Sequence, residues 1–333
     1  MLKNFLITGG SGFIGSHFVE LLLSNNKKII NIDIKKDKFL KIKNKNYKFF
    51  QGNICNYKFL DKIINKKIDC IVNFAAQTHV DRSIDFPKDF VQNNILGTFN
   101  ILEILRKKKL RPIFTQISTD EVFGSLKTSQ KSFNENSLIK PNSPYSASKA
   151  SADHLVRSYN KTFNFKTIIT HSSNNFGERQ HPEKLIPLSI MQLLNKKKIP
   201  IYGNGENIRD WIYVKDNCKC IYKIINKKKF GTSYLVGSKN ELSNLKIAKI
   251  IVNSFKKISK QEVLGNGIKF VKDRKGHDFR YAINNKKLKG LIKFNFSNFD
   301  EKIKATIVHY IENYRYYKKE LNKKWLKEKI NNN

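Results

Sequence analysis

The 333-residue chain contains little cysteine and no long apolar run. Its four cysteines, Cys55, Cys70, Cys218 and Cys220, lack the paired spacing of a zinc site or a redox motif, and the seven histidines include no pair at helical ligand spacing. No apolar run reaches the roughly 18 to 20 residues that a membrane span requires. We therefore expect no bound metal and no membrane partner. Since residues 5–8 already form a strand pattern before a glycine turn, no targeting segment fits, and we expect a cytoplasmic protein.

Acidic residues are also scarce, because 27 Asp and Glu face 64 Lys and Arg, for a formal net charge of +37. Such an excess could neutralise the phosphates of a nucleic acid. However, the lysines fall in short runs between apolar segments, as on solvated helix ends, and no nucleic-acid-binding motif accompanies them. We therefore expect no nucleic-acid partner. Only nine of the basic residues are arginine, so the positions that keep arginine are informative.

The length of the chain favours two domains that share a cleft. Strand patterns alternate with helical ones, which predicts an α/β fold with a doubly wound parallel sheet (Rossmann) and a second, smaller α/β substrate domain. The first domain would cover residues 1–172 and about 209–232, and the second about 173–208 and 233–333. The expected strands cover residues 3–8, 29–34, 49–53, 68–74 and 111–117. The expected helices cover residues 17–24, 87–107 and 299–329, and one begins at Tyr145.

A glycine-rich loop follows the first strand. Gly9, Gly12 and Gly15 would permit a tight turn, close approach of the backbone to a pyrophosphate, and close packing of helix on strand. Asp33 lies 18 positions beyond Gly15, near the end of the second strand, where a carboxylate can accept both ribose hydroxyls of adenosine. This spacing favours NAD over NADP. The alternative is a solvated acid at the start of a loop, because residues 35–48 are lysine-rich and could tolerate a phosphate.

Residues 118–124 read Ser-Thr-Asp-Glu-Val-Phe-Gly and follow the fifth strand. Neighbouring acids on a strand point to opposite faces, so they can act on one substrate only where the strand has ended and the backbone turns. In open α/β sheets, ligands bind beyond the carboxyl ends of the strands. We therefore place Thr119, Asp120 and Glu121 in the active site.

Tyr145 and Lys149 begin the next helix, four residues apart and so on one helical face. A tyrosine is a poor base near neutral pH unless a cation favours its phenolate, and Lys149 can supply that cation. The alternative, an ordinary amphipathic tyrosine beside a surface lysine, is weakened by the glycine loop and the Thr-Asp-Glu segment in the same chain.

Arginine reappears in the second half of the chain, in segments rich in loops. Its planar fork suits phosphate, which indicates an anionic substrate. The alternative is structural ion pairing with Asp210, Asp273 or Asp278. The positions concerned are Arg179, Arg209, Arg274 and Arg280.

With these motifs in place, the chain resembles the extended short-chain dehydrogenase/reductases, and among them the dTDP-glucose 4,6-dehydratases. The glycine loop and the Tyr-Lys pair mark the superfamily, whereas Thr-Asp-Glu-Val-Phe-Gly and several later blocks are specific to the dehydratases. The resemblance runs nearly from end to end. Its further blocks lie at residues 79–83, 145–155, 173–177, 182–187, 209–211 and 273–278.

The resemblance implies NAD as cofactor and a nucleotide sugar as substrate. The implied catalytic residues are Thr119, Asp120, Glu121, Tyr145 and Lys149. The implied cofactor contacts are Gly9, Gly12, Phe13, Ile14, Gly15, Asp33, Asn53, Ile54, Ala75, Ala76, Asn94, Tyr145 and Lys149. The implied substrate contacts are His79, Arg82, Asn174, Lys184, Leu185, Tyr202, Arg209, Asn244, Arg274 and His277. A homodimer is implied through helices at about 87–107 and 145–163.

The implied reaction converts dTDP-glucose to dTDP-4-keto-6-deoxyglucose and water. Tyr145 would take the proton of the 4-hydroxyl while hydride passes to NAD, Glu121 would take the proton from carbon 5, and Asp120 would protonate the departing 6-hydroxyl. Hydride would then return to carbon 6. Elimination needs an acid and a base on the same sugar, which accounts for the paired carboxylates.

Several residues depart from the pattern of this family and leave other functions open. Asn53 stands where Asp is usual, Gln77 where Glu is frequent, and Glu178-Arg179 replaces a Pro-Tyr type pair near the sugar site. Alternatives are a 4-epimerase, a decarboxylase, or a dehydratase of a GDP-, CDP- or UDP-sugar, and a non-catalytic NAD-binding regulator.

Overall fold

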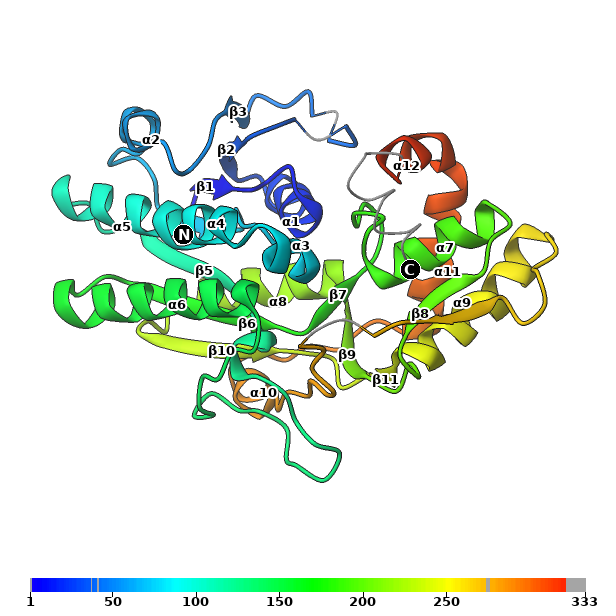
Figure 1. Cartoon of the computed structure of the whole chain (residues 1–333). Helices are drawn as coiled ribbons and strands as arrows, with labels where there is room; N and C mark the ends of the chain where they lie inside the picture. The colour runs from blue at the N-terminus through cyan, green and yellow to red at the C-terminus, as the bar shows by residue number, and fades with distance from the viewer. Residues whose placement is uncertain (1, 37, 41, 274–275, 322–333) are drawn as a thin grey trace.

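The structure is a computed structural model that describes residues 2–36, 38–40, 42–273 and 276–321. A seven-stranded sheet forms its centre, with the strand order β10-β6-β5-β4-β1-β2-β3 (Figure 1). Each neighbouring pair in this sheet is parallel. The strands are β1 (Asn4–Thr8), β2 (Lys28–Asp33), β3 (Tyr47–Gln51), β4 (Cys70–Asn73), β5 (Ile113–Thr119), β6 (Thr167–Ser172) and β10 (Thr232–Val236).

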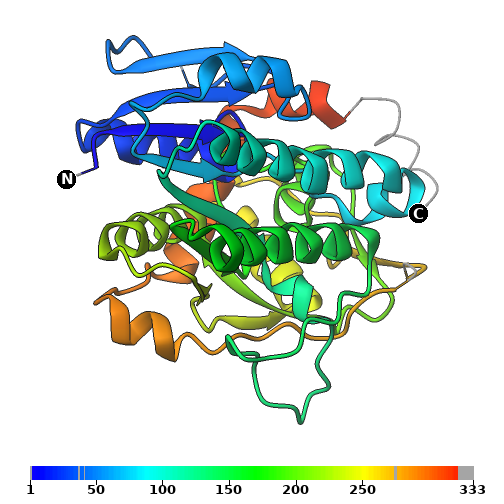
Figure 2. The same ribbon diagram turned by 90° about the vertical axis from the view of Figure 1, so that its left-hand side faces the viewer.

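Helices cover both faces of this sheet (Figures 1 and 2). On one face α1 (Phe13–Ser24) packs beside α8 (Val214–Lys227), and on the other lie α2 (Tyr57–Ile63), α5 (Gly97–Lys107) and α6 (Pro144–Phe163). Side chains of β1 alternate between two cores, with Phe5 and Ile7 toward α1 and Leu6 toward α5. Strands buried on both faces read as continuous apolar runs, which is why the sequence predicted this doubly wound sheet.

The order of the strands reverses between β1 and β4, which are neighbours in the sheet. At such a point the two connections leave toward opposite faces and open a crevice beyond the carboxyl ends of the strands. The glycine loop leaves β1 and residues Phe74 to Ala76 leave β4 at this crevice. The predicted ligand-binding edge is therefore the edge at which the sequence motifs collect.

A smaller α/β part lies beside the large sheet, at the right of Figure 1. It has a three-stranded sheet of order β11-β9-β7 and a parallel two-stranded sheet of β12 and β8. Its strands are β7 (Asn174–Phe176), β8 (Ile199–Tyr202), β9 (Ile208–Tyr213), β11 (Glu241–Ser243) and β12 (Ile268–Val271). The helices α7 (Leu185–Leu194), α9 (Asn244–Ser259), α11 (Phe299–Glu312) and α12 (Tyr314–Leu321) pack together around it, while α10 (Lys286–Leu291) contacts β10.

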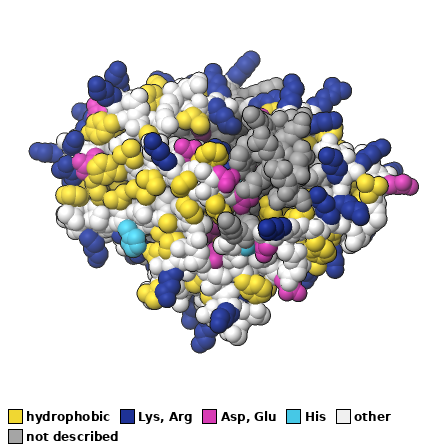
Figure 3. Space-filling model, in the orientation of Figure 1, with side chains coloured by type: hydrophobic (Ala, Val, Ile, Leu, Met, Phe, Trp, Pro, Cys, Tyr) yellow, Lys and Arg dark blue, Asp and Glu magenta, His cyan; other side chains and the backbone are white. Residues whose placement is uncertain are grey.

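Lysine and arginine side chains are scattered around the face shown in Figure 3, whereas hydrophobic side chains gather over α4 (Pro87–Phe90), α5 and α6. The exposed large apolar residues of this region are Ile84, Phe86, Val91, Leu96 and Phe99. No helix within the described ranges combines the length and the apolar character needed to cross a bilayer.

Two expected boundaries were wrong beside the active site. Helix α1 begins at Phe13 rather than at His17, so the helix starts inside the glycine motif with Gly12 as its N-cap. Strand β5 continues through Thr119 rather than ending at Ile117, because Ser118 and Thr119 still pair with β6. The turn that reorients the acids is a single 3-10 turn, η2 (Asp120–Phe123).

The expected helix over residues 87–107 is not one regular helix. After α3 (Val80–Asp85), the chain forms α4 (Pro87–Phe90), a π-helical segment η1 (Val91–Leu96) and then α5. The wide turns of η1 bring Asn94 inward, where its side chain accepts from the backbone N–H of Gln77 and donates to Ser148 Oγ, each at 2.8 Å. π-turns inside helices often mark functional sites, and this one supports the start of α6.

The expected C-terminal helix over residues 299–329 is also interrupted. Helix α11 ends at Glu312, and Asn313 caps it through its backbone and side-chain N–H groups to His309 O. Helix α12 then folds back, with the Tyr317 ring centroid 4.4 Å from that of Tyr310. The remainder of the expectation, residues 322–329, lies outside the described residues.

Candidate active site

Two cavities adjoin at the carboxyl edge of the large sheet. One reaches from the glycine loop to β5, β6 and α6, and the other lies between α3 and the smaller part of the fold. The residues that line both cavities are Glu121, Asn174, Asn175, Gln180 and Lys184. A molecule in the first cavity and a molecule in the second would therefore meet beside Glu121.

The glycine loop shapes the first cavity. Gly9 has φ +70, and a Cβ there would lie 2.6 Å from the Ala75 backbone nitrogen, while a Cβ on Gly15 would overlap the carbonyl of Gly9. No side chain caps the N-terminus of α1, so its first N–H groups remain available to an anion. The predicted cofactor residues that line this cavity are Gly9, Gly12, Phe13, Ile14, Gly15, Ala76, Tyr145 and Lys149. This arrangement fits the pyrophosphate and the nicotinamide half of NAD.

Asp33 ends β2 directly beside the loop. Its Oδ2 accepts from the backbone N–H of Ser11 at 2.9 Å, and burial raises its pKa. The Asp33 carboxylate thus fixes the glycine loop by accepting from Ser11. It lies at the end of the strand next to β1, which is the position expected of an acid that binds the adenosine ribose. Its contact with the cofactor stays a prediction.

Four other predicted cofactor residues do not line this cavity. Asn53 Oδ1 accepts from Cys55 N at 2.8 Å, and Ile54 is buried beneath Gly97. Ala75 N donates to Thr8 Oγ1, and Asn94 supports Gln77. A direct contact with NAD remains a prediction for each of these residues.

Thr119, Asp120 and Glu121 come together at the exit of β5. Thr119 Oγ1 accepts from the backbone N–H of Glu121 at 3.3 Å, which caps η2 and turns the two acids away from the strand direction. Asp120 is buried, whereas Glu121 is half-buried between the two cavities. The three residues predicted to be catalytic therefore share one corner of the site.

The environment of Asp120 favours its protonated form. Burial raises the pKa of the Asp120 carboxyl well above its ordinary value, and the charges of Glu121 and Asp210 raise it further. Asp120 Oδ2 has no hydrogen-bond partner among the described residues. A carboxyl that keeps its proton at neutral pH can act as a general acid.

Tyr145 and Lys149 enter the same corner from α6. A capping box of Ser143 and Ser146 fixes the start of this helix, and the Lys149 Nζ donates to the carbonyl of Ile117 at 2.6 Å. Burial raises the pKa of Tyr145 well above its ordinary value, the charge of Glu121 adds to the rise, and a hydrogen bond with Thr119 opposes it. Burial also lowers the pKa of Lys149, and the charge of Asp153 opposes this fall.

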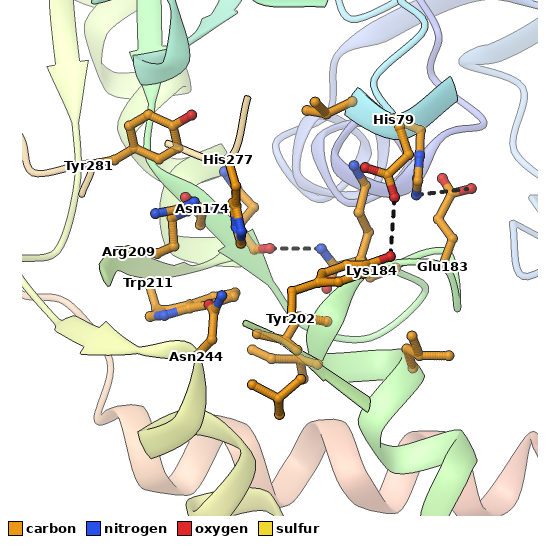
Figure 4. Close-up of a pocket in the computed structure, with 18 of the residues that line it drawn as sticks. His79, Asn174, Glu183, Lys184, Tyr202, Arg209, Trp211, Asn244, His277 and Tyr281 are labelled. Atoms are coloured by element: carbon orange, nitrogen blue, oxygen red, sulfur yellow. Dashed lines mark hydrogen bonds and ion pairs between the residues drawn. The ribbon is translucent and has the colours of Figure 1, made fainter. Parts of the chain in front are cut away.

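The second cavity collects most of the predicted substrate residues (Figure 4). Those that line it are His79, Asn174, Lys184, Leu185, Tyr202, Arg209, Asn244 and His277. Arg82 does not line it, and its backbone N–H donates to His79 Nδ1 at 3.3 Å. Arg274 lies outside the described residues.

Arg209 is buried in the wall of this cavity. Its guanidinium donates to the carbonyls of Ile208, Phe279 and Asp278 and lies 4.3 Å from the ring centroid of Tyr281. Arg179 and Arg280 instead form ion pairs at 2.7 and 2.8 Å, with Glu20 and Glu241 respectively. Those two arginines are structural, and their partners are glutamates rather than the expected aspartates.

The Glu178-Arg179 pair was expected near the sugar, but both side chains are engaged elsewhere. Glu178 accepts from the hydroxyl of Tyr213 at 3.0 Å, and its carbonyl meets the His17 ring on α1. Arg179 pairs with Glu20 on the same helix. Glu178 and Arg179 therefore connect α1 to the smaller part of the fold. The next residue, Gln180, lines both cavities.

Several residues of the second cavity were not among the substrate contacts predicted from the sequence. Trp211 and Tyr281 stand opposite His79 and Lys184 (Figure 4), and Glu183 lies 3.9 Å from the His79 ring. Trp211 lies two residues beyond Arg209, so strand alternation could have placed it on the same face. Glu183 lies in the block at residues 182–187 and directly precedes Lys184, whereas Tyr281 had no local signal, because tertiary packing brings it to the cavity.

Contacts across the second cavity join the two parts of the fold. Lys184 Nζ donates to the carbonyl of Thr78 at 2.9 Å, and the hydroxyl of Tyr202 donates to Asp81 at 3.5 Å. Over the part of the chain that the structure describes, no group of three or more His, Cys, Asp or Glu is arranged to hold a metal ion.

Comparison with known proteins agrees with this geometry. A family model described as GDP-mannose 4,6 dehydratase matches residues 6–306. The dTDP-glucose 4,6-dehydratase of Neisseria gonorrhoeae is 37% identical, over 93% of this chain and 96% of that protein. The dTDP-glucose 4,6-dehydratase DesIV of Streptomyces venezuelae, solved with NAD and TYD bound, is 33% identical, with a TM-score of 0.89 over 96% of this chain and 100% of that one. The dTDP-glucose 4,6-dehydratase of Bacillus anthracis, solved with NAD, is 37% identical, with a TM-score of 0.84 over 96% and 99% of the two chains.

These likenesses extend over nearly the whole chain, and they confirm both the doubly wound fold and the resemblance that the motifs carried. The chain therefore belongs to the GDP-mannose 4,6 dehydratase family within the extended short-chain dehydrogenase/reductases, and its relatives there include dTDP-glucose 4,6-dehydratases.

Proposed function

We propose that the chain is an NAD-dependent nucleotide-sugar 4,6-dehydratase that converts dTDP-glucose to dTDP-4-keto-6-deoxyglucose and water. One observation carries the proposal: a buried acid, a half-buried acid and a Tyr-Lys pair meet where the two cavities adjoin. The names of the relatives support the same reaction and the same cofactor.

In the first step Tyr145 takes the proton of the 4-hydroxyl. Thr119 orients that hydroxyl, and Lys149, held by the Ile117 carbonyl, favours the phenolate by its charge. NAD, when bound, would accept hydride from carbon 4, return it to carbon 6, and through its positive ring oppose the high pKa of Tyr145. A carboxylate at Asp33 would hold the adenosine ribose.

In the second step Glu121 takes the proton from carbon 5 and Asp120 protonates the departing 6-hydroxyl, which leaves as water. Glu121 gives its proton back to carbon 5 when carbon 6 receives the hydride. The division follows from burial, because Asp120 is buried with a raised pKa whereas Glu121 faces both cavities. An acid and a base on one sugar must differ in protonation state, and neighbouring positions in different environments supply that difference.

The second cavity would hold the nucleotide diphosphate. Lys184 and Arg209 supply cationic groups to its wall, and Asn174, Asn244 and His277 supply further polar groups. We also assign His79, Leu185 and Tyr202 to this site, and Arg82 and Arg274 remain proposals from the resemblance alone.

A second candidate is the same reaction on a GDP-sugar, which the description of the family favours. A 4-epimerase or decarboxylase is a weaker candidate, because neither reaction requires Asp120 and Glu121 as an acid-base pair. The nucleotide base is the open choice within the proposal.

We further propose a homodimer formed by α4 to α6, and a cytoplasmic location where sugar nucleotides and NAD are available. The apolar side chains that gather over these helices support the dimer (Figure 3). We also propose the two-domain division at residues 172, 209 and 232, although β10 hydrogen-bonds with β6 in the large sheet.

The test is incubation of the purified chain with dTDP-, UDP-, CDP- and GDP-glucose and with GDP-mannose, followed by mass spectrometry. We expect dTDP-glucose to lose one water without net production of NADH. Loss of water from GDP-mannose alone would establish the second candidate. Epimerisation or decarboxylation without loss of water would contradict both.

A further inference from the structure

Asp153 is a fully buried carboxylate that the proposed reaction does not use. It lies on α6, four residues after Lys149 and eight after Tyr145, and its exposure is 0%. Residues four apart on a helix are neighbours on one face, so Tyr145, Lys149 and Asp153 form a row. The row faces the ends of β5 and β6, where the site lies.

Two side chains from the sheet hold this carboxylate. Ser118 Oγ on β5 donates to Asp153 Oδ2 at 2.6 Å, and His171 Nε2 on β6 lies 3.1 Å from the same oxygen. Ser118 and His171 are register partners in the sheet, and Ser118 directly precedes Thr119. The carboxylate therefore joins α6 to two strands at the level of the catalytic corner.

The surroundings of His171 indicate a neutral ring. The ring is fully buried beside Phe123, and its Nδ1 has no hydrogen-bond partner among the described residues. A protonated ring would also carry a hydrogen on Nδ1, and that buried N–H would have no acceptor. Its free-energy cost is higher than that of a buried Nδ1 lone pair without a donor. With Nε2–H donated to Asp153 Oδ2, His171 brings no charge of its own to that carboxylate, whose other oxygen, Oδ1, is buried without a hydrogen-bond partner among the described residues.

The group that needs this charge is Lys149. Its ammonium is buried, and a buried charge is costly unless it is paired. The Ile117 carbonyl accepts one of its N–H groups but brings no charge. Burial lowers the pKa of Lys149, and the charge of Asp153, one helical turn away, acts in the opposite direction.

The other elements packed on α6 do not replace Asp153. From η2, the charges of Glu121 and Asp120 act on Tyr145, on which the charge of Asp153 also acts. Segments β5 and η1 contribute no titratable side chain. Helices α3 and α4 meet Tyr145 through Val80 and Phe90, α5 meets Tyr159 through Glu103, and Arg157, one turn beyond Asp153, reaches Ser233.

We propose that Asp153, held by Ser118 and His171, is a positioning residue that supplies the counter-charge of Lys149 and fixes the Tyr145-Lys149 row against Thr119. The inference rests on the proposed function for the roles of Tyr145 and Lys149. It adds a buried residue that touches neither sugar nor cofactor but sets the charge of one that does.

The test is Asp153→Asn, nearly the same in shape but without charge, in the full chain with dTDP-glucose and NAD. Without the counter-charge Lys149 loses its proton at lower pH, so the alkaline limb of the kcat profile should move down by about one pH unit. At alkaline pH kcat should then fall about tenfold while the KM for dTDP-glucose changes little. The matched control is His171→Gln, which keeps an N–H donor to Asp153 and cannot become charged. The alkaline limb of its kcat profile should therefore lie at the same pH as in the wild type.

An Asp153→Asn profile that loses kcat equally at every pH would overturn the proposal, because it would show a structural role only. A shifted alkaline limb in the kcat profile of His171→Gln would contradict the inference that the His171 ring is neutral. If Asp153→Asn is too unstable to assay, Asp153→Ser, which keeps a hydroxyl for its two partners, is measured with the same two outcomes.

A failed dehydration assay of the wild type would contradict the proposed function but not the counter-charge. The affinity for NAD, measured by calorimetry as a function of pH, then replaces the kcat profile. Affinity should weaken at a lower pH in Asp153→Asn than in the wild type, and identical pH profiles would overturn the proposal.

Discussion

Asp33, Asp120, Asp153 and Asp210 are four aspartates around one site, and their surroundings give them different chemistry. Asp33 accepts from a loop N–H, and Asp153 accepts from Ser118 and lies within hydrogen-bond distance of a histidine ring. Asp120 and Asp210 each bury an Oδ2 that has no hydrogen-bond partner among the described residues. Asp153 Oδ1 also lacks a partner among the described residues, and Asp210 Oδ1 accepts from Ser238 and Asn240. The raised pKa values of Asp120 and Asp210 therefore follow chiefly from burial, which disfavours the charged form, and not from the one unpartnered oxygen.

At the residue scale, Tyr145→Phe and Glu121→Gln should stop the reaction at different steps. Tyr145→Phe lacks the base for the first step, so turnover should fall about 10²- to 10⁴-fold with no reduced nicotinamide formed. Glu121→Gln can still oxidise carbon 4, so reduced nicotinamide should accumulate on the enzyme. The measurement is nicotinamide absorbance after rapid mixing with dTDP-glucose.

Asn175→Ala is a suitable comparison, because Asn175 lines both cavities without belonging to the acid-base set. It should alter binding but still form and consume reduced nicotinamide. Absence of reduced nicotinamide in Glu121→Gln would remove Glu121 from the role of base at carbon 5.

Asp210 gives a second prediction at this scale, concerning stability. Burial raises its pKa to about 6, from an ordinary value of 3.8. Between these values the folded state holds a proton that the unfolded state has released, so stability falls as pH rises through this window, by about 3 kcal/mol in all. Asp210→Asn should remove this part of the pH dependence. The measurement is the free energy of urea unfolding from about pH 4 to about pH 7.

Ser238→Ala is the control, since it removes a hydrogen bond of 3.2 Å to Asp210 but keeps the ionisable group. Its pH slope should persist. An Asp210→Asn chain with the wild-type slope would show that another group causes the pH dependence.

At the scale of elements, the π-helical segment η1 connects the cofactor side of the site to α6. Asn94 bonds the backbone of Gln77 through both side-chain atoms and also reaches Ser148, next to Lys149. The segment therefore fixes the exit of β4 and the first turns of α6 together. A regular helix over these residues would turn Asn94 away from at least one of these partners.

Asn94→Ala should lower the free energy of unfolding by about 2 to 4 kcal/mol, because it removes three hydrogen bonds of a buried side chain, one of them to the buried hydroxyl of Ser148. Asn93→Ala is the neighbouring control. Its partly exposed side chain bonds the Asp89 carbonyl, so the loss should be about 0.5 kcal/mol or less. Urea unfolding followed by circular dichroism measures both, and equal losses would contradict the bridging role of Asn94.

At the scale of the whole molecule, the apolar side chains and the positive charge are distributed differently. Lysines surround the visible face, whereas exposed apolar side chains gather over α4 to α6 (Figure 3). Exposed apolar patches mark association surfaces, and lysine-rich regions resist association through charge repulsion. This contrast supports the proposed dimer face.

Val91→Glu should shift the proposed dimer toward monomer, weakening association about 100-fold, because a two-fold axis places two new charges in one apolar interface. Val91 is 53% exposed, and Phe270 on β12 is 59% exposed. Phe270→Glu, far from α4 to α6 in sequence and on the smaller part, is the matched control. Sedimentation at several concentrations measures both, and an unchanged dimer in Val91→Glu would exclude this face.

Local patterns predicted much of this molecule because their causes are local. The glycine loop, the Thr-Asp-Glu exit and the Tyr145-Lys149 spacing each follow from backbone geometry over a few residues. Apolar runs of buried strands predicted the parallel sheet for the same reason. Boundaries failed where a neighbouring strand or side chain decides them, as at Thr119, which pairs with β6, and at Asn94 in η1.

The sequence by itself therefore determined the fold class, the glycine loop and which residues meet at the exit of β5, since these depend on period, glycine and spacing. Only the tertiary structure decided which carboxyl is buried, that Arg179 and Arg280 pair with glutamates, and that Ser118 and His171 hold Asp153 behind Lys149. Burial and long-range pairing depend on segments far apart in the chain. The charge and protonation state of a carboxyl group therefore depend on the packed molecule, and a short stretch of sequence does not determine them.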